Sequence, residues 1–236
     1  MTNTFLKAEW KNLIMVNYPV DPGLLQNYLP HKTELDLWNT TCYVSLVGFM
    51  FLNTAIKGIK IPFHNKFAQV NLRFYIRYEE KGEWKRGVVF IKEITAKPLV
   101  KFIAKMAYNE KYETLPMTHR CESDGNSLLV EYNWKKEKWN SLRIVADTNG
   151  KNTQDVHEQE FIAEHYWGYT KWNETRTIEF GVVHPRWHVY KTIDHQVDVD
   201  FGNTYGQDFH FLSCQSPSSV FLAEGSKIAL TRGITI

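Results

Sequence analysis

The stretch VNLRFYIRYEEKGEWKRGVVFIKEI, from Val70 to Ile94, contains two runs of alternating apolar and polar residues around one glycine. A period of two is typical of β-strands whose faces meet different surroundings. Gly82 can adopt the positive φ of a tight turn, so Lys81 and Gly82 form the predicted loop. The stretch therefore predicts an antiparallel hairpin that pairs residues 70–78 with residues 86–93.

This register divides the hairpin into two chemically different faces. The first face is apolar and predicts a core layer; it consists of Val70, Leu72, Phe74, Ile76, Val89 and Ile91. The second face carries four cations; it consists of Asn71, Arg73, Tyr75, Arg77, Arg86, Val88, Phe90 and Lys92. The role of the hairpin depends on what this cationic face meets.

Two interpretations of the cationic face remain open. It can be a solvated outer face, where charged side chains protect a strand from mispairing. It can also face the interior of a barrel, where an unpaired cation is costly and needs a carboxylate or an anionic ligand. Tyr75, Val88 and Phe90 weaken the solvated interpretation because they place large apolar groups among the cations.

The rest of the chain predicts one mostly antiparallel domain over residues 1–236. With 236 residues, of which 43% are hydrophobic, the chain can bury a substantial core. Short runs rich in β-branched and aromatic residues predict strands at 43–53, 67–78, 85–94, 127–134, 141–146, 175–183 and 218–225. Helices are predicted at 98–112 and 153–169, and a helical turn capped by Asp21 starts at Pro22.

Charge and hydropathy exclude several kinds of partner. The 28 basic and 26 acidic residues are mixed along the chain, so we expect no nucleic-acid partner. The most apolar run, residues 43–52, is about half of what a membrane-spanning helix needs, so we expect no membrane partner. Three dispersed cysteines without a CxxC pair predict reduced, buried thiols and a cytoplasmic location.

One helical stretch has a pattern that can bind a metal. His157, Glu160 and Glu164 fall on one face of the predicted helix at 153–169. A solvated flank explains the same spacing, and no second such helix completes a bundle-type site. The motifs of serine hydrolases, zincins, P-loop proteins and Rossmann proteins do not occur in the sequence. We therefore expect no metal and no cofactor.

Five segments resemble a known family. They are ELDLWNTTCYVSLVGFMF, VNLRFYIR, RGVVFIKEI, YNEKYETLPM and HPRW, in that order along the chain. The chain resembles the YqjF-like family of uncharacterised bacterial proteins, whose fold is similar to that of acetoacetate decarboxylase. The resemblance implies an α+β fold, a large mostly antiparallel β-barrel or cone with flanking helices around a small-molecule cavity.

The decarboxylase forms a Schiff base through a lysine, and the resemblance allows this lysine to be sought here. It falls on Met117, or on Thr118 if the gap is placed differently. A thioether cannot form an imine, and Lys92 could replace the lysine only if its side chain reached the same cavity. Schiff-base chemistry is therefore not expected, although the cavity is.

The expected ligand is a small anionic, carboxylate-type molecule, with Arg73 as its anchor. Tyr75, Tyr108, Met117 and Trp187 are the expected wall residues. The first alternative is an enzyme of unknown, lyase-like reaction; its candidate catalytic residues are Glu110, His184 and Lys92, with Glu110 either an acid or base or the partner of Arg73. The second is a non-catalytic sensor or interaction module. Whether the chain is an enzyme, and whether it forms a homo-oligomer, stays open.

Overall fold

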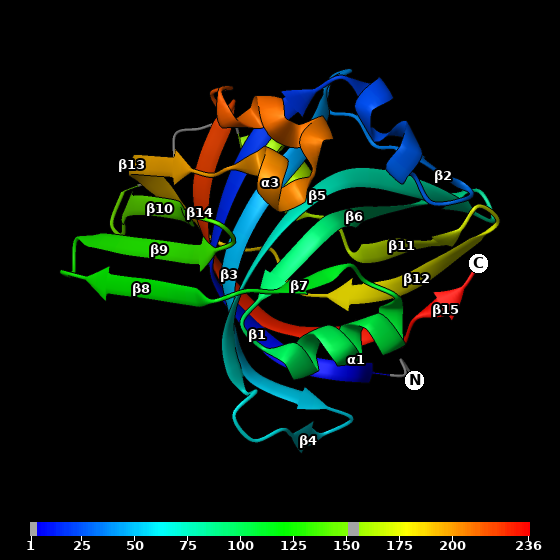
Figure 1. The fold of residues 1–236 in the computed structure, drawn as a ribbon, viewed down its shortest axis with the longest axis horizontal. Helices are drawn as coiled ribbons and strands as arrows, with labels where there is room; N and C mark the ends of the chain where they lie inside the picture. Colours follow the sequence, from blue (N-terminus) through cyan, green and yellow to red (C-terminus); the bar gives the residue numbers. More distant parts are fainter. Residues whose placement is uncertain (1–3, 151–155) are drawn as a thin grey trace.

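The computed structural model describes residues 4–150 and 156–236 (Figure 1). Its strands are β1 (Thr4–Val20), β2 (Thr33–Leu35), β3 (Cys42–Ile56), β4 (Ile59–Lys60), β5 (Lys66–Glu80), β6 (Glu83–Thr95), β7 (Tyr112–Thr114), β8 (Met117–Ser123), β9 (Ser127–Lys135), β10 (Trp139–Asp147), β11 (Trp167–Asn173), β12 (Arg176–Val183), β13 (Val189–Asp198), β14 (Ser219–Thr231) and β15 (Ile234–Thr235). Its helices are η1 (Pro22–Tyr28), α1 (Pro98–Tyr108), α2 (Val156–Ala163), α3 (Phe201–Tyr205) and η2 (Gln207–Ser213).

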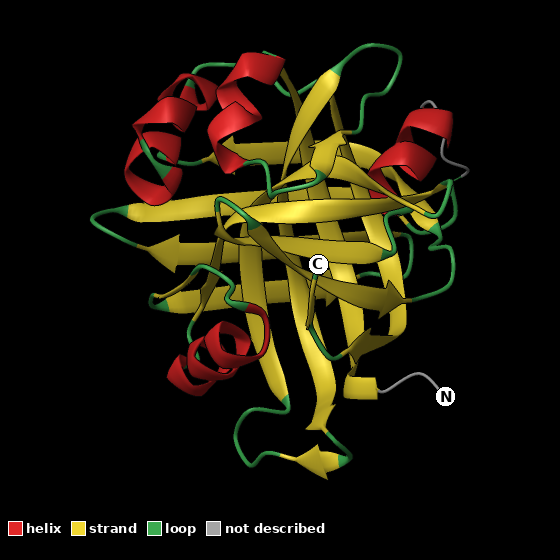
Figure 2. Ribbon diagram, turned by 90° about the vertical axis from the view of Figure 1, so that its right-hand side faces the viewer, coloured by secondary structure: helices red, strands yellow, loops and turns green. Residues whose placement is uncertain are grey.

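Seven of the strands close into a ring. The hydrogen-bonded order is β12-β11-β6-β5-β3-β1-β14, and β14 pairs again with β12 through Val182 opposite Leu230. From β14 the sheet continues outward through β13, β10, β9 and β8, which lie to one side of the ring in Figure 1. Most pairs are antiparallel, and helices flank the strands (Figure 2). The expected mostly antiparallel fold with flanking helices is confirmed, with a ring-like sheet.

The hairpin of β5 and β6 forms as predicted at its turn. Lys81 and Gly82 both have positive φ values, 55° and 84°, and they connect the two strands. Arg73 lies opposite Phe90, and Tyr75 lies opposite Val88, as the simple register requires.

A β-bulge then shifts the pairing on the β6 side. Leu72 lies opposite Lys92 and Arg73 opposite Phe90, so Ile91 is an extra residue in β6. Because a bulge reverses the alternation beyond it, Lys92 shares a face with Leu72 and Glu93 shares a face with Asn71. The prediction that Lys92 shares the face of Arg73 is wrong for this reason.

The two faces of the hairpin contact two separate cores. The predicted apolar layer belongs to the outer core, in which the ring packs against β9, β10, α3 and η2; its members include Leu72, Phe74, Val89, Tyr132, Trp134, Leu142, Phe201 and Phe209. The opposite face of the ring contacts the inner core; its members include Phe49, Phe51, Tyr75, Val88, Tyr108, Phe161, Phe180 and Leu230. The part of the hairpin that carries Arg73, Tyr75, Val88 and Phe90 therefore points into the ring.

Both predicted helices end earlier than the sequence predicts, and residues 153–155 of the helix predicted at 153–169 lie outside the described residues. Helix α1 begins with Pro98 and stops at Asn109, whose φ of 58° is left-handed, so the predicted extension to Tyr112 is wrong. Helix α2 ends at Ala163 because the chain pairs as β11 from Trp167 onward. Asp21 does cap η1, since its side chain accepts a 2.6 Å bond from the Gly23 amide.

Besides the strands of two or three residues, the prediction missed four strands: β1, β8, β11 and β13. The cysteines also differ from expectation: Cys42 is buried, whereas Cys121 and Cys214 are exposed. Across the described residues, every helix is too short or too polar to cross a bilayer.

Candidate functional site

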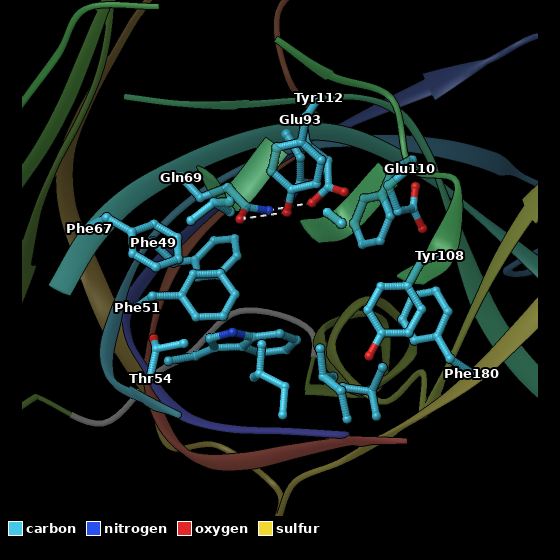
Figure 3. A pocket seen from close by; sticks show the side chains of 18 of the residues that line it. Phe49, Phe51, Thr54, Phe67, Gln69, Glu93, Tyr108, Glu110, Tyr112 and Phe180 are labelled. Carbon is cyan, nitrogen blue, oxygen red and sulfur yellow. Dashed lines mark hydrogen bonds between the residues drawn. The ribbon is translucent and has the colours of Figure 1, made fainter. Parts of the chain in front are cut away.

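A cavity of about 110 Å³ lies inside the ring, between the inner faces of the strands and helix α1. Its walls are mostly aromatic and aliphatic; they include Trp10, Phe49, Phe51, Phe67, Val88, Phe90, Tyr108, Phe180, Val182 and Leu230. Figure 3 shows the rings of Phe49, Phe51, Phe67, Tyr108 and Phe180 around the open space, with the polar side chains of Gln69, Glu93 and Glu110 along one wall. An apolar cavity with a few placed polar groups is the usual form of a small-molecule site.

Unpaired polar atoms are concentrated at this cavity. Nine buried side-chain nitrogen or oxygen atoms have no hydrogen-bond partner among the described residues. Five of them belong to residues that line the cavity: Trp10 Nε1, Thr54 Oγ1, Asn71 Oδ1, Arg73 Nε and His165 Nδ1. Buried polar groups are nearly always paired in folded proteins. The cavity is therefore suited to a ligand that carries polar groups of its own.

Arg73 is the buried cation of the cavity. Its side chain is on the inner face of β5, and the residue is only 8% exposed. Nη2 donates to the Ile162 carbonyl at 3.1 Å, and the guanidinium carbon lies 5.6 Å from the centre of the Tyr75 ring. Within residues 4–150 and 156–236, no carboxylate forms an ion pair with Arg73. The other cations of the hairpin differ in this respect.

Arg77, Arg86 and Lys92 each have an acidic partner. Arg77 Nε contacts Glu34 at 2.6 Å near the surface, and Arg86 Nε contacts Asp36 at 2.6 Å. Lys92 Nζ contacts Glu113 at 3.0 Å and donates to the Thr204 carbonyl, on the outer side of the ring. Of the two interpretations left open, the interior one describes Arg73, whereas ion pairing outside the cavity explains Arg77 and Lys92.

Asp36 and His165 form a buried pair that the sequence did not indicate. His165 Nε2 lies 3.2 Å from Asp36 Oδ2, and the same oxygen accepts from Arg86. Burial raises the pKa of Asp36, but the bonds from His165 and Arg86 outweigh it and hold the pKa below its usual range. Burial lowers the pKa of His165 to about 4 despite Asp36. The ring is therefore neutral at neutral pH beside an ionised carboxylate.

This pair also determines the tautomer of His165. An ionised carboxylate only accepts hydrogen bonds, so Nε2 of His165 carries the proton and donates to Asp36. Nδ1 is then an unprotonated acceptor, buried without a partner among the described residues, and His165 itself lines the cavity. This tautomer leaves Nδ1 able only to accept a hydrogen bond.

Two buried carboxyls, Glu93 and Glu110, lie along the same wall (Figure 3). Gln69 donates to Glu93 and accepts a 2.9 Å bond from the Tyr112 hydroxyl. Thr170 donates to Glu110 at 2.7 Å. Burial raises the pKa of Glu110 to about 8, and burial together with the charge of Glu110 raises the pKa of Glu93 well above its usual range. At neutral pH Glu110 is therefore mainly a carboxylic acid, which can donate a hydrogen bond.

His184 and Trp187 close another part of the wall. Their rings stack at 4.2 Å with an interplanar angle of 18°. His184 Nδ1 donates to the Pro185 carbonyl at 2.9 Å, and Trp187 Nε1 donates to Ser226 at 2.9 Å. Burial, aided by the nearby charge of Arg73, lowers the pKa of His184, so this ring is also neutral at neutral pH.

The structure brings together five of the eight residues proposed from the sequence. Those that line the cavity are Arg73, Tyr108, Glu110, His184 and Trp187. Tyr75 lies behind Arg73, with its hydroxyl 2.6 Å from Ser45 Oγ. Met117 packs against the outer core and Lys92 lies outside the ring, so neither reaches the cavity. Glu110 accepts a hydrogen bond from Thr170 and does not form an ion pair with Arg73.

The acidic residues of the helical pattern considered for a metal form ion pairs with an arginine. Glu160 and Glu164 both contact Arg186, at 3.0 and 2.8 Å. His157 Nδ1 lies 3.9 Å from Glu160. No cluster of three potential metal ligands occurs among the described residues.

Residues 7–227 match the family model DUF2071, described as an uncharacterized conserved protein. The chain belongs to this family. The uncharacterized protein YqjF of Bacillus subtilis (strain 168) is 30% identical to the DUF2071 chain over 77 residues. That match covers 32% of the chain and 32% of YqjF, so it spans about a third of the relative.

Solved structures share the fold of the DUF2071 chain at low sequence identity. Acetoacetate decarboxylase from Legionella pneumophila superposes with a TM-score of 0.66 and 11% identity over 98% of this chain and 87% of that one. The enduracididine biosynthesis enzyme MppR complexed with pyruvate superposes with a TM-score of 0.66 and 12% identity, over 100% of this chain and 91% of that one. An acetoacetate decarboxylase-like enzyme from Sphingomonas wittichii RW1 superposes with a TM-score of 0.64 and 10% identity, over 97% of this chain and 93% of that one. These likenesses show the fold alone.

Proposed function

We propose that this DUF2071 chain binds a small carboxylate inside the ring, with Arg73 as the anchor. The observation that carries the proposal is the buried Arg73 guanidinium, which lines the cavity without an acidic partner among the described residues. An unpaired buried cation is costly. A carboxylate offsets that cost, because it supplies a negative charge and two acceptor oxygens. The aromatic walls would hold the apolar part of the ligand.

A structure of the same fold supports this class of ligand. MppR has been solved with pyruvate bound, and pyruvate is a small carboxylate. None of the described residues that line the cavity is a lysine, so the proposal involves binding without an imine. The carboxylate would be held by hydrogen bonds and charge only.

The test is thermal stabilisation by short keto and hydroxy acids compared with their amides. Hydrogen bonds to charged groups contribute roughly 1.5–3 kcal/mol, so Arg73→Met should weaken acid binding by about ten- to a hundredfold. Arg73→Lys should retain part of the preference because it keeps the charge. Arg77→Met is the matched control, since Arg77 pairs with Glu34 away from the cavity.

Circular dichroism of each variant separates lost binding from lost folding. Equal stabilisation of the wild type by acids and amides would contradict the proposal. So would an unchanged preference for acids in a folded Arg73→Met protein.

A reaction on the bound acid is the second candidate function. The observation that favours it is Glu110, a protonated carboxyl at neutral pH on the cavity wall. Such a group can act as a general acid. Proton NMR of each acid after incubation would detect turnover, and Glu110→Gln should abolish it while leaving binding at Arg73 intact.

A further inference from the structure

Three of the residues that line the cavity, Asn71, Arg73 and His165, each have a buried polar atom without a partner among the described residues. Asn71 and Arg73 are two residues apart on the inner face of β5, a spacing of about 7 Å along a strand. His165 lies beside Arg73, because the Tyr75 ring contacts both: its centre is 5.6 Å from the guanidinium carbon and 4.7 Å from the centre of the His165 ring. Arg73 also bonds Ile162, three residues before His165.

The three atoms differ in hydrogen-bonding character. Arg73 Nε–H is a donor, whereas His165 Nδ1 and Asn71 Oδ1 are acceptors. The acceptor role of Nδ1 follows from the Asp36 carboxylate, which takes the proton-bearing Nε2. All three atoms are buried and lack partners among the described residues. A complementary ligand must therefore present an anion to Arg73 and a donor to the acceptor beside it, His165 Nδ1.

We infer that the ligand is a 2-hydroxy acid: its carboxylate binds Arg73, and the hydroxyl on the adjacent carbon donates to His165 Nδ1. This inference rests on the proposed function and specifies the substrate class of the same site. A 2-keto acid fits less well, because its keto oxygen is an acceptor and would meet another acceptor, His165 Nδ1.

Charge decides between a hydroxy acid and an amino acid. Asp36 is already paired with Arg86, and His165 is neutral, so Arg73 is the charge near this part of the cavity without a described partner. One carboxylate balances it. The ammonium group of a 2-amino acid would add a second buried cation beside the guanidinium, which is unfavourable.

The experiment is isothermal titration of the wild type with four acids that share one carbon skeleton. They are 2-hydroxybutyrate, 2-oxobutyrate, 2-aminobutyrate and butyrate. We expect 2-hydroxybutyrate to bind about tenfold more tightly than butyrate and about ten- to a hundredfold more tightly than 2-oxobutyrate. In His165→Phe, which keeps an aromatic ring but no acceptor, the hydroxybutyrate-to-butyrate ratio should fall to about one.

A second variant keeps the test decisive if His165→Phe does not fold. Asp36→Asn removes the carboxylate that keeps the proton on Nε2, and the new amide can donate to Nε2, so Nδ1 becomes the protonated donor and the preference should shift from 2-hydroxybutyrate toward 2-oxobutyrate. The control Glu34→Gln changes a carboxylate that pairs with Arg77 away from the cavity, and it should preserve the preference.

The outcomes separate the inference from the proposed function. If all four acids bind in an Arg73-dependent manner with equal affinity, or if 2-oxobutyrate or 2-aminobutyrate binds best, the inference is overturned and the proposed function stands. If butyrate and butyramide bind equally and Arg73→Met changes neither, the proposed function fails, and the inference fails with it.

Discussion

Glu110 shows how strongly its surroundings change a single residue. It is buried, accepts one hydrogen bond from Thr170, and has a pKa raised to about 8 mainly by burial. Because the folded state holds this proton more tightly than the unfolded state, its contribution to stability is fully present below the ordinary value of 4.5. That contribution is lost as the pH rises toward 8.

We therefore expect the free energy of unfolding to fall as the pH rises from 6.5 to 8. His165 and His184 act in the opposite direction, because their lowered pKa values make stability rise while the unfolded histidines lose their protons around pH 6.5, and this effect fades above that pH. A single carboxyl contributes a fall of about 2 kcal/mol over this interval, and Glu93 adds to it. Urea unfolding at several pH values measures the slope.

The matched variants are Glu110→Gln and Glu137→Gln. Glutamine at position 110 removes the titrating group. The free energy of unfolding should then fall less steeply with pH, by the amount that corresponds to about one proton. Glu137 is exposed in the turn between β9 and β10, so its replacement should leave the slope unchanged. A pH profile of Glu110→Gln that equals the wild-type profile would show that Glu110 is ionised throughout.

Sequence patterns identified some residues of this site and missed others for physical reasons. Arg73 was found because alternation in VNLRFYIR places it opposite the apolar face. Glu93 was missed because alternation without a bulge assigns it to the core face. Asp36 and His165 are 129 residues apart, and only the folded ring brings them together.

At the scale of elements, turns and close approaches depend on two glycines with nearly the same backbone conformation. Gly82 in the hairpin turn has a φ of 84°, and Gly225 in β14 has a φ of 83°. A methyl group at Gly82 would meet no atom within 4 Å. At Gly225 it would lie 2.1 Å from the Trp10 carbonyl oxygen in β1.

Alanine at these two positions should separate conformational strain from steric clash. Gly82→Ala should destabilise the protein by about 1–2 kcal/mol, the cost of a left-handed residue with a side chain. Gly225→Ala should cost a further 1–3 kcal/mol or so, because the β1 backbone must move. The measurement is the difference between the free energies of unfolding of the two variants in urea. Equal destabilisation would mean that the β1 backbone moves away from the new methyl group at no cost.

The elements were predictable where the pattern is local. The β5–β6 turn and the η1 cap follow from Gly82 and from Asp21 before Pro22, and both are confirmed. The ends of α1 and α2 were not predictable, because Asn109 adopts a left-handed conformation and Trp167 is recruited into a strand pair with Gly181. The ring closure, Val182 opposite Leu230, also depends on contacts that no short segment encodes.

At the scale of the molecule, the shared fold raises the question of shared chemistry. Treatment with sodium borohydride in the presence of acetoacetate traps an imine wherever a reactive lysine forms one. We expect no mass increase in this protein, because none of the described residues lining the cavity is a lysine. Lys92 is held outside the ring by Glu113 and the Thr204 carbonyl.

Intact-mass spectrometry reads the result, with an acetoacetate decarboxylase as the positive control. Met117→Lys should also remain unmodified, because position 117 packs against the outer core and not the cavity. An adduct mapped to Lys92 in the wild type would contradict the position assigned to that side chain.

The wall formed by β5 and β6 is a single layer of sheet, with the outer core on one side and the cavity on the other. Leu72, Phe74 and Val89 contact the outer core, whereas Asn71 and Arg73 contact the cavity. Selection can therefore act on neighbouring positions almost independently. Substitutions on the cavity side can change the lining of the cavity while the residues between them preserve the scaffold, so one face of this wall can vary without redesign of the fold.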